Sequence, residues 1–364
     1  MTSPYVNPVA RRHREPEAPD TSSFHAGLPG FAPTRLVDAP SLAAELRVGR
    51  VLVKEESSRL GLPAFKILGA SYAVSRALGE RLGLDGIPSL DALREALGDD
   101  SGIELVAATD GNHGRAVAHM ARVLGLPARV FAPAGISDAA ITGIRSEGAQ
   151  LTVLDLPYDN VVETAIATAA ESGAQLIQDS GWDGYESVPQ WIVDGYSTLF
   201  VEADRQAADA GAARVDLVAV PVGVGSLAET AVRHYRSGAS EPTILSVEPT
   251  SAPCLLESLH AGRMVSVQTG STVMAGLNCG TPSASAWAPL LAGVDAAVEV
   301  TDAEAITAVR DLAALGIDSG PCGASTLAGV RAVKDVLDLG PDAVVLLIST
   351  ESLSANPLEG RREG

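Results

Sequence analysis

The chain has 364 residues, of which 46% are hydrophobic, so it has ample apolar material for a large folded core and usually two lobes. Its 26 lysines and arginines against 45 aspartates and glutamates give a formal net charge of -19, which repels nucleic-acid backbones and anionic membranes. No segment approaches the ~20 uninterrupted apolar residues of a membrane span, and the N-terminus lacks the apolar core of a signal peptide. We therefore expect a cytoplasmic protein with neither nucleic-acid nor membrane partners.

Metal chemistry is not expected either. The three cysteines and six histidines form neither a CxxC pair nor an HExxH motif, so the spacing of zinc sites is absent. In a reducing compartment, each cysteine is interpreted as a buried free thiol.

The predicted elements alternate along the chain. Residues 1–22 are polar and proline-bearing without periodicity, which predicts a mobile arm. Beyond them, short Val/Leu/Ile/Ala runs alternate with amphipathic stretches, the pattern of βαβ units around a mostly parallel sheet. Strands are predicted at 51–54, 104–109, 128–134, 150–155, 174–179, 215–222, 243–249, 296–301 and 343–350. Helices are predicted at 69–83, 114–125, 159–173, 226–238, 302–316 and 324–340, with a surface insertion at 83–102.

Ligands of open parallel sheets bind at the carboxyl ends of the strands, and three such ends carry residues that packing alone does not require. One is "PVGVGSLAETAV", where Gly223, Val224, Gly225 and Ser226 join a strand to a helix. Backbone N–H groups at the positive end of a helix form a phosphate cradle. The stretch also fits G-x-G-x-x-A, and Glu248 ends the next strand, where a ribose-binding acid would stand, so a dinucleotide site stays open at this point.

Lys66 marks the second strand end, among apolar neighbours in "PAFKILGA". Desolvation beside a positive helix end disfavours the ammonium form and leaves a nucleophilic amine suited to Schiff-base chemistry. The alternative is a surface lysine whose stem packs on apolar neighbours.

The third is "ATDGNHGRAVA", in which Thr109, Asp110, Gly111, Asn112 and His113 lie between a strand and a helix. Two glycines and three polar side chains exceed what a helix N-cap requires, although a cap is the simplest interpretation. The backbone donors suit an anion, and a carboxylate beside an anion site indicates proton transfer.

A lysine amine, a phosphate cradle and an asparagine-bearing anion loop are together what pyridoxal 5′-phosphate requires. In the order Lys66, Asn112, Gly223, the chain resembles the fold-type II pyridoxal-phosphate family of threonine and serine dehydratases and threonine synthase. Within that family it looks most similar to the diaminopropionate ammonia-lyases, which carry Asp where Asp110 stands and where dehydratases carry Ser or Thr. The similar segments are 24–34, 53–73, 108–118, 177–196, 246–254, 272–280 and 348–350.

The resemblance implies an α/β fold of two lobes, each with a mostly parallel twisted sheet flanked by helices. The large lobe would comprise 23–66 and 177–364, and the small lobe 67–176, with the cofactor in the cleft. It also implies a homodimer. The tail departs from the family after Glu351, in "STESLSANPLEG".

The resemblance implies a reaction as well: elimination of ammonia from D- or L-2,3-diaminopropionate to give aminoacrylate, then pyruvate and a second ammonia. Lys66 would bond the cofactor and act as base on the L-substrate, and Asp110 would be the base for the D-enantiomer. Cofactor contacts would come from Asn112 at the ring hydroxyl, Gly223 to Ser226 at the phosphate, and Ser349 or Thr350 at the ring nitrogen. Substrate contacts would come from Asp179, Thr109, Gly111, His113 and Tyr185.

Other interpretations stay open. A serine or threonine dehydratase, or another β-elimination or β-replacement enzyme, would keep the cofactor and change the leaving group. An NAD-dependent oxidoreductase would use the "GVGSLA" loop differently and leave Lys66 unexplained. A binding protein derived from such an enzyme would hold the cofactor without turnover. Trp182, Tyr185, Trp191 and Tyr196 fall at helix-like spacing and are interpreted mainly as packing aromatics.

Overall fold

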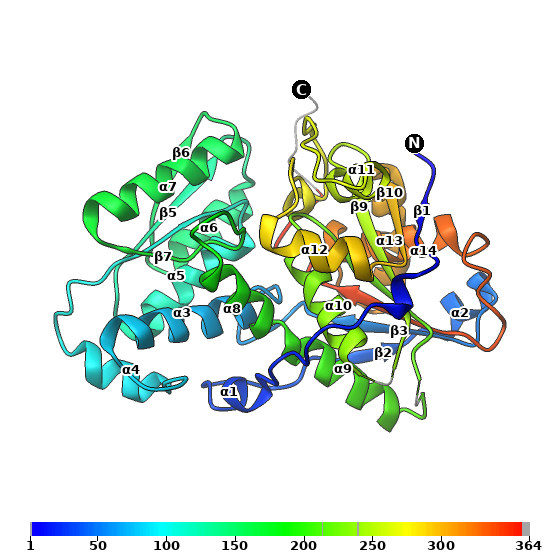
Figure 1. Cartoon of the computed structure of the whole chain (residues 1–364), viewed down its shortest axis with the longest axis horizontal. Helices are drawn as coiled ribbons and strands as arrows, with labels where there is room; N and C mark the ends of the chain where they lie inside the picture. Colours follow the sequence, from blue (N-terminus) through cyan, green and yellow to red (C-terminus); the bar gives the residue numbers. More distant parts are fainter. Residues whose placement is uncertain (1, 213, 239, 359–364) are drawn as a thin grey trace.

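The computed structural model describes residues 2–212, 214–238 and 240–358, which form two lobes side by side (Figure 1). Each lobe has its own sheet, with strand order β1-β10-β9-β8-β11-β3-β2 in the large lobe and β6-β5-β4-β7 in the small one. All strands of the small sheet fall within 67–176, and all strands of the large sheet fall outside that range. In the described part of the chain, no helix is long and apolar enough to cross a membrane.

The large sheet is parallel at its centre and antiparallel at its two edges. Its strands are β1 (Tyr5–Val6), β10 (Ala296–Val300), β9 (Thr243–Pro249), β8 (Leu217–Pro221), β11 (Val344–Ser349), β3 (Arg50–Glu55) and β2 (Leu36–Asp38). Only the pairings of β1 with β10 and of β2 with β3 are antiparallel among these strands. Every residue of β8 is buried, which explains its unbroken apolar run.

Helices cover both faces of the large sheet. Val218 and Val220 of β8 join one core cluster, together with Ala231 of α10 (Ser226–Ser237). Leu217 joins a second cluster, together with Leu327 of α14 (Pro321–Val333). Successive side chains of a strand point to opposite faces, so one strand supplies both cores.

The small sheet is wholly parallel and consists of β6 (Gln150–Leu154), β5 (Ala128–Pro133), β4 (Leu105–Ala108) and β7 (Gln175–Leu176). The helices not yet named are α1 (Ser22–Ala26), α2 (Pro40–Leu46), α3 (Ile67–Leu82), α4 (Leu90–Leu97), α5 (Asn112–Leu124), α6 (Asp138–Ser146), α7 (Tyr158–Ser172), α8 (Ser187–Gly195), α9 (Ser197–Asp209), α11 (Cys254–Ala261), α12 (Ala284–Gly293) and α13 (Asp302–Ala314). Short 3-10 turns occur at Ala10–Arg12 and Ala275–Leu277. Each predicted strand and helix has a counterpart in this set.

The N-terminal segment differs from the mobile arm that its composition predicts. Within it, β1 pairs with β10, and the Asn7 N–H donates to the Asp295 carbonyl at 2.7 Å. Further on, the Glu15 N–H donates to the Arg236 carbonyl at 3.1 Å. The chain runs along the large lobe in dark blue in Figure 1. An edge strand leaves backbone groups unpaired, and pairing them holds a polar segment in place without an apolar core of its own.

Candidate active site

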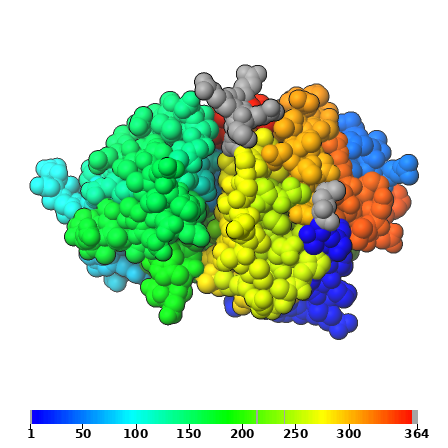
Figure 2. Space-filling model, turned by 90° about the horizontal axis from the view of Figure 1, so that it is seen from above, coloured from blue at the N-terminus to red at the C-terminus, as the bar shows by residue number. Residues whose placement is uncertain are grey.

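A cavity of about 730 Å³ lies where the two lobes meet, along the seam between the green and yellow surfaces in Figure 2. Its walls come from the segments that follow β4, β5, β8 and β11, together with the loop before α3. The carboxyl ends of both sheets therefore face one space, as the topology of parallel sheets favours.

Lys66 directly precedes α3 and lines this cavity, with 22% of its side chain exposed. Its Nζ donates to Oδ2 of Asp179 at 2.8 Å. Burial would lower the pKa of Lys66, but the Asp179 carboxylate raises it above its ordinary value. The sequence-based expectation of a lowered pKa is therefore wrong, because a counter-ion outweighs desolvation.

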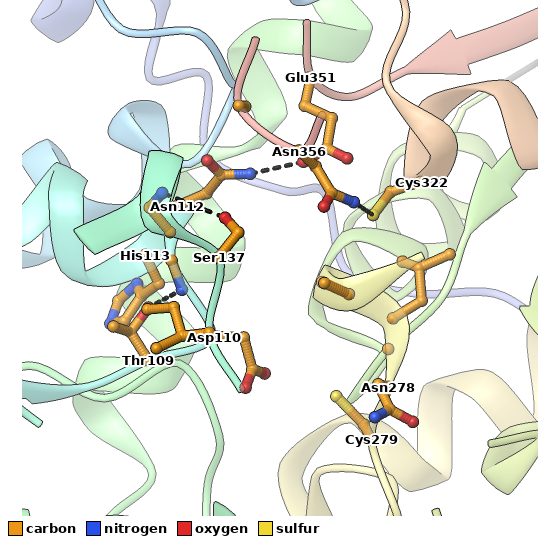
Figure 3. A pocket seen from close by; sticks show the side chains of 18 of the residues that line it. Thr109, Asp110, Asn112, His113, Ser137, Asn278, Cys279, Cys322, Glu351 and Asn356 are labelled. Carbon is orange, nitrogen blue, oxygen red and sulfur yellow. Dashed lines mark hydrogen bonds between the residues drawn. The ribbon is translucent and has the colours of Figure 1, made fainter. Parts of the chain in front are cut away.

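The Asp110 loop is shaped by Thr109, whose Oγ1 accepts the N–H groups of Gly111 at 2.9 Å and Gly114 at 2.8 Å. Gly111 has a φ of +143°, and a Cβ on Gly114 would lie 2.4 Å from Thr109 Cγ2, so both glycines are required there. The turn directs Asp110 toward the wall that carries Cys279 (Figure 3).

The pKa values of the two aspartates of the cavity, Asp110 and Asp179, are shifted in opposite directions. Burial and the neighbouring Asp179 raise the pKa of Asp110 to about 7, against the opposing effect of Lys66. Burial would also raise the pKa of Asp179, but His113 and Lys66 outweigh it and lower that pKa to about 2. One carboxyl is thus held as an ion while the other changes protonation near neutral pH.

His113 supports the site from behind. Its Nε2 lies 2.8 Å from the carbonyl oxygen of Ile177, and its Nδ1 lies 3.8 Å from Asp179 Oδ2. Burial lowers the pKa of His113, so the ring is neutral at neutral pH. A neutral ring whose Nε2–H donates to a backbone carbonyl positions its neighbours.

The glycine loop after β8 fits a phosphate. Gly225 has a φ of +104°, and a Cβ there would lie 2.6 Å from Leu290 Cδ1. A Cβ on Gly223 would lie 2.9 Å from the Gly276 carbonyl oxygen. Because α10 begins at Ser226, its first amides have no partner within the helix and point outward from its positive end. The cavity therefore offers an anion cradle and a lysine amine, the donor set that pyridoxal 5′-phosphate requires.

Glu248 does not support a dinucleotide site. It is fully buried, and its two carboxylate oxygens accept the N–H groups of Leu255 and Leu256, each at 2.7 Å. The carboxylate thus caps α11 instead of facing a ribose.

The structure brings most of the predicted site residues together. The cavity is lined by Lys66, Thr109, Asp110, Gly111, Asn112, His113, Asp179, Gly223, Val224, Gly225, Ser226 and Thr350. Ser349 is not among the lining residues, because its hydroxyl donates to Ser319 Oγ at 2.7 Å.

Tyr185 is also absent from the cavity lining. Its hydroxyl accepts the Gln178 N–H and donates to the Leu176 carbonyl, each at 3.0 Å, and its ring stacks on Trp182. These two aromatics pair in a β-bridge before α8, so the helix-like spacing does not extend over them. Tyr185 therefore braces the end of β7.

The cavity is also lined by residues that the sequence did not assign to the site, among them Tyr158 and Glu351. Tyr158 begins α7, and its hydroxyl accepts from Gln178 Nε2 at 3.1 Å. Glu351 follows β11, and its Oε2 accepts from Asn112 Nδ2 at 2.6 Å. Nothing local marks Tyr158, whereas the carboxyl end of a predicted strand was a signal for Glu351. No cluster of three or more potential metal ligands occurs in the described ranges.

Comparison with known proteins adds a family. The family described as "Pyridoxal-phosphate dependent enzyme" matches residues 28–351. A diaminopropionate ammonia-lyase of Salmonella typhimurium is 37% identical over 357 residues, covering 90% of this chain and 87% of that protein. The Escherichia coli K12 diaminopropionate ammonia-lyase is 34% identical over 346 residues, covering 90% and 86%. The crystal structure of the Escherichia coli enzyme with an aminoacrylate-PLP azomethine reaction intermediate has a TM-score of 0.87, at 32% identity, covering 97% of this chain and 94% of that one.

Proposed function

Because this chain belongs to the pyridoxal-phosphate-dependent enzymes and, within them, to the diaminopropionate ammonia-lyase family, we propose that it eliminates ammonia from 2,3-diaminopropionate. The Cα–H and Cβ–N bonds break, a Cα–Cβ double bond forms, and the aminoacrylate released hydrolyses to pyruvate and a second ammonia. Pyridoxal 5′-phosphate, when bound, supplies an electron sink for the charge left at Cα.

The chain's own residues divide the remaining tasks. Lys66 would hold the cofactor through its amine, and the backbone of Gly223 to Ser226 would hold its phosphate. Asn112 and Thr350 would contact the ring. These assignments are supported by the fact that all of these residues line the same cavity.

Proton movement would fall to Lys66 and Asp110. Asp110 would accept the Cα proton of the D-enantiomer and Lys66 that of the L-enantiomer, since a base is needed on each face of the substrate. Lys66 would return a proton to the departing ammonia. Asp179, an ion at neutral pH, would attract the amino groups of the substrate.

The observation that carries the proposal is Asp110, a carboxyl that lines the cavity with a pKa of about 7. A group with that pKa is poised to exchange a proton at neutral pH, which the Ser or Thr of a dehydratase at this position does not do. Asp110 therefore favours the ammonia-lyase reaction over the dehydratase reaction.

The test is the visible spectrum of the purified enzyme before and after adding D- and then L-2,3-diaminopropionate, with pyruvate followed by a coupled assay. We expect a yellow species, pyruvate from at least one enantiomer, and neither with Lys66→Ala. L-serine and L-threonine serve as comparators. Pyruvate or 2-oxobutyrate formed from these hydroxy amino acids, with none formed from the diamine, would contradict the proposal.

We also propose that the enzyme works as a cytoplasmic homodimer, the assembly that the family resemblance implies. Light scattering coupled to size exclusion would give twice the 37.3 kDa chain mass. A monomer at micromolar concentration would contradict the assembly without affecting the chemistry.

A further inference from the structure

Glu351 is held rigidly where three parts of the site meet. The Phe65 N–H, next to Lys66, donates to the Thr350 carbonyl at 3.1 Å, and the Gly320 N–H before α14 donates to the Glu351 carbonyl at 2.8 Å. Ala64 and Glu351 form an antiparallel bridge. The Glu351 side chain is only 3% exposed, yet it lines the cavity. Its backbone and carboxyl are therefore placed by the fold.

The carboxylate reaches across the cavity to the other lobe. Asn112 starts α5 in the small lobe, and its Nδ2 donates to Glu351 Oε2 at 2.6 Å, a contact drawn in Figure 3. A carboxylate accepts hydrogen bonds and donates none, so it selects the nitrogen side of the Asn112 amide. Cys322 and Asn356, both from the large lobe, also interact with the Glu351 carboxyl.

We infer that Glu351 is a positioning residue that fixes the orientation of the Asn112 amide toward the cofactor. With one Nδ2 hydrogen committed to Glu351, the other hydrogen stays available to an oxygen in the cavity. The inference rests on the proposed contact between Asn112 and the ring hydroxyl. Glu351, from the opposite lobe, would then determine whether the nitrogen or the oxygen of the Asn112 amide faces the ring hydroxyl.

The loss of an acceptor at position 351 would change which atom of the Asn112 amide faces the cofactor. Without an acceptor at position 351, the Asn112 amide is free to rotate and present its oxygen instead of its nitrogen. An amide oxygen cannot donate a hydrogen bond to the ring oxygen, so both cofactor affinity and the ring's absorption change. Burial raises the pKa of Glu351, and hydrogen bonds from Cys322, Asn112 and Asn356 oppose that rise. Among these partners, Asn112 is the one that comes from the small lobe.

The experiment compares Glu351→Gln, which keeps an acceptor oxygen, with Glu351→Met, which keeps the bulk and loses the acceptor. Pyridoxal 5′-phosphate affinity of the apoenzymes and the visible spectrum of the holoenzymes are measured. We expect Glu351→Met to weaken affinity about tenfold and move the absorption maximum, and Glu351→Gln to stay within about threefold of wild type, the range for one hydrogen bond lost or kept. Asp216→Asn is the matched control, because Asp216 Oδ2 accepts the Val344 N–H at the opposite end of β11.

A double-mutant cycle with Asn112→Ala separates positioning from packing. If Glu351 acts through Asn112, Glu351→Met has no further effect on affinity in the Asn112→Ala background; additive losses would overturn the inference.

Should Glu351→Met not fold, the cofactor affinity of Asn112→Asp tests the inference instead, because this variant places two carboxylates next to each other. Adding Glu351→Gln then restores cofactor affinity at least about fivefold, by relief of like-charge repulsion, and no recovery overturns the inference.

The readouts need no substrate. An enzyme that binds its cofactor with this coupling but leaves diaminopropionate unchanged would contradict the proposed function alone. An active lyase with additive variants would contradict the inference about Glu351 alone.

Discussion

Single residues decide the chemistry that this cavity performs. Asp110 and Asp179 share the cavity, but only Asp179 forms an ion pair with Lys66, so the two pKa values are about 7 and about 2. Two carboxyl groups whose environments separate their pKa values suit different roles, and in the proposed reaction Asp110 would carry a proton and Asp179 would be a fixed charge.

The pH dependence of turnover tests this assignment. Because the base must be ionised, kcat/KM for D-2,3-diaminopropionate is expected to rise as the pH increases through about 7, where Asp110 loses its proton. Asp110→Asn should lower this value by about 100-fold or more and remove that limb, with a smaller effect on the L-enantiomer. The L-enantiomer is thus the internal control. Equal losses for both enantiomers would contradict the role of Asp110 as the base for one face.

The junction of β8 and α10 depends on backbone conformation. Ala at position 225 would adopt a φ of +104° and set its Cβ 2.6 Å from Leu290 Cδ1. Strain at a left-handed non-glycine residue costs about 1–3 kcal/mol, and the loop must shift. Gly225→Ala is expected to weaken pyridoxal 5′-phosphate binding about tenfold or more, measured by equilibrium dialysis. Gly340→Ala is the control, since a Cβ there meets nothing within 4 Å; equal affinities in both variants would contradict the cradle.

The C-terminal end of α14 is a helix boundary that the apolar periodicity of the sequence does not predict. The apolar pattern predicts a helix to residue 340, but α14 ends at Val333 and a turn follows. Val336 continues the apolar pattern, but 56% of it is exposed. A longer helix would therefore gain no stabilisation from burial at this position. The helices that sequence reasoning did not predict, such as α8 and α9, pack between or against other helices, where their context supplies the stabilising contacts.

The whole molecule includes the N-terminal segment as part of its large sheet. Deletion of residues 2–13 removes β1 and exposes the edge of β10. We expect the melting temperature to fall by about 2–6 °C, as about 1–3 kcal/mol does for a chain of this size, and aggregation to increase. Calorimetry and light scattering measure both, with the exposed Val9→Ser as control. Wild-type melting and dispersity in the deleted protein would show that the pairing contributes nothing.

Local sequence patterns are enough to predict the alternation of strands and helices, the Lys66 segment, the Asp110 loop and the glycine loop. Each of these is local: a run of buried residues, a turn that needs glycine, or a helix N-terminus declares itself within about ten residues.

How these segments act on one another depends on contacts between residues that are far apart in the chain. The ion pair of Lys66 with Asp179 joins residues 113 apart in the chain, and the hydrogen bond of Asn112 with Glu351 joins residues 239 apart. Desolvation alone predicts a lowered pKa for Lys66, whereas a distant carboxylate raises it. The sign of an electrostatic effect depends on which charges the fold brings within a few ångströms, and no local pattern contains that information.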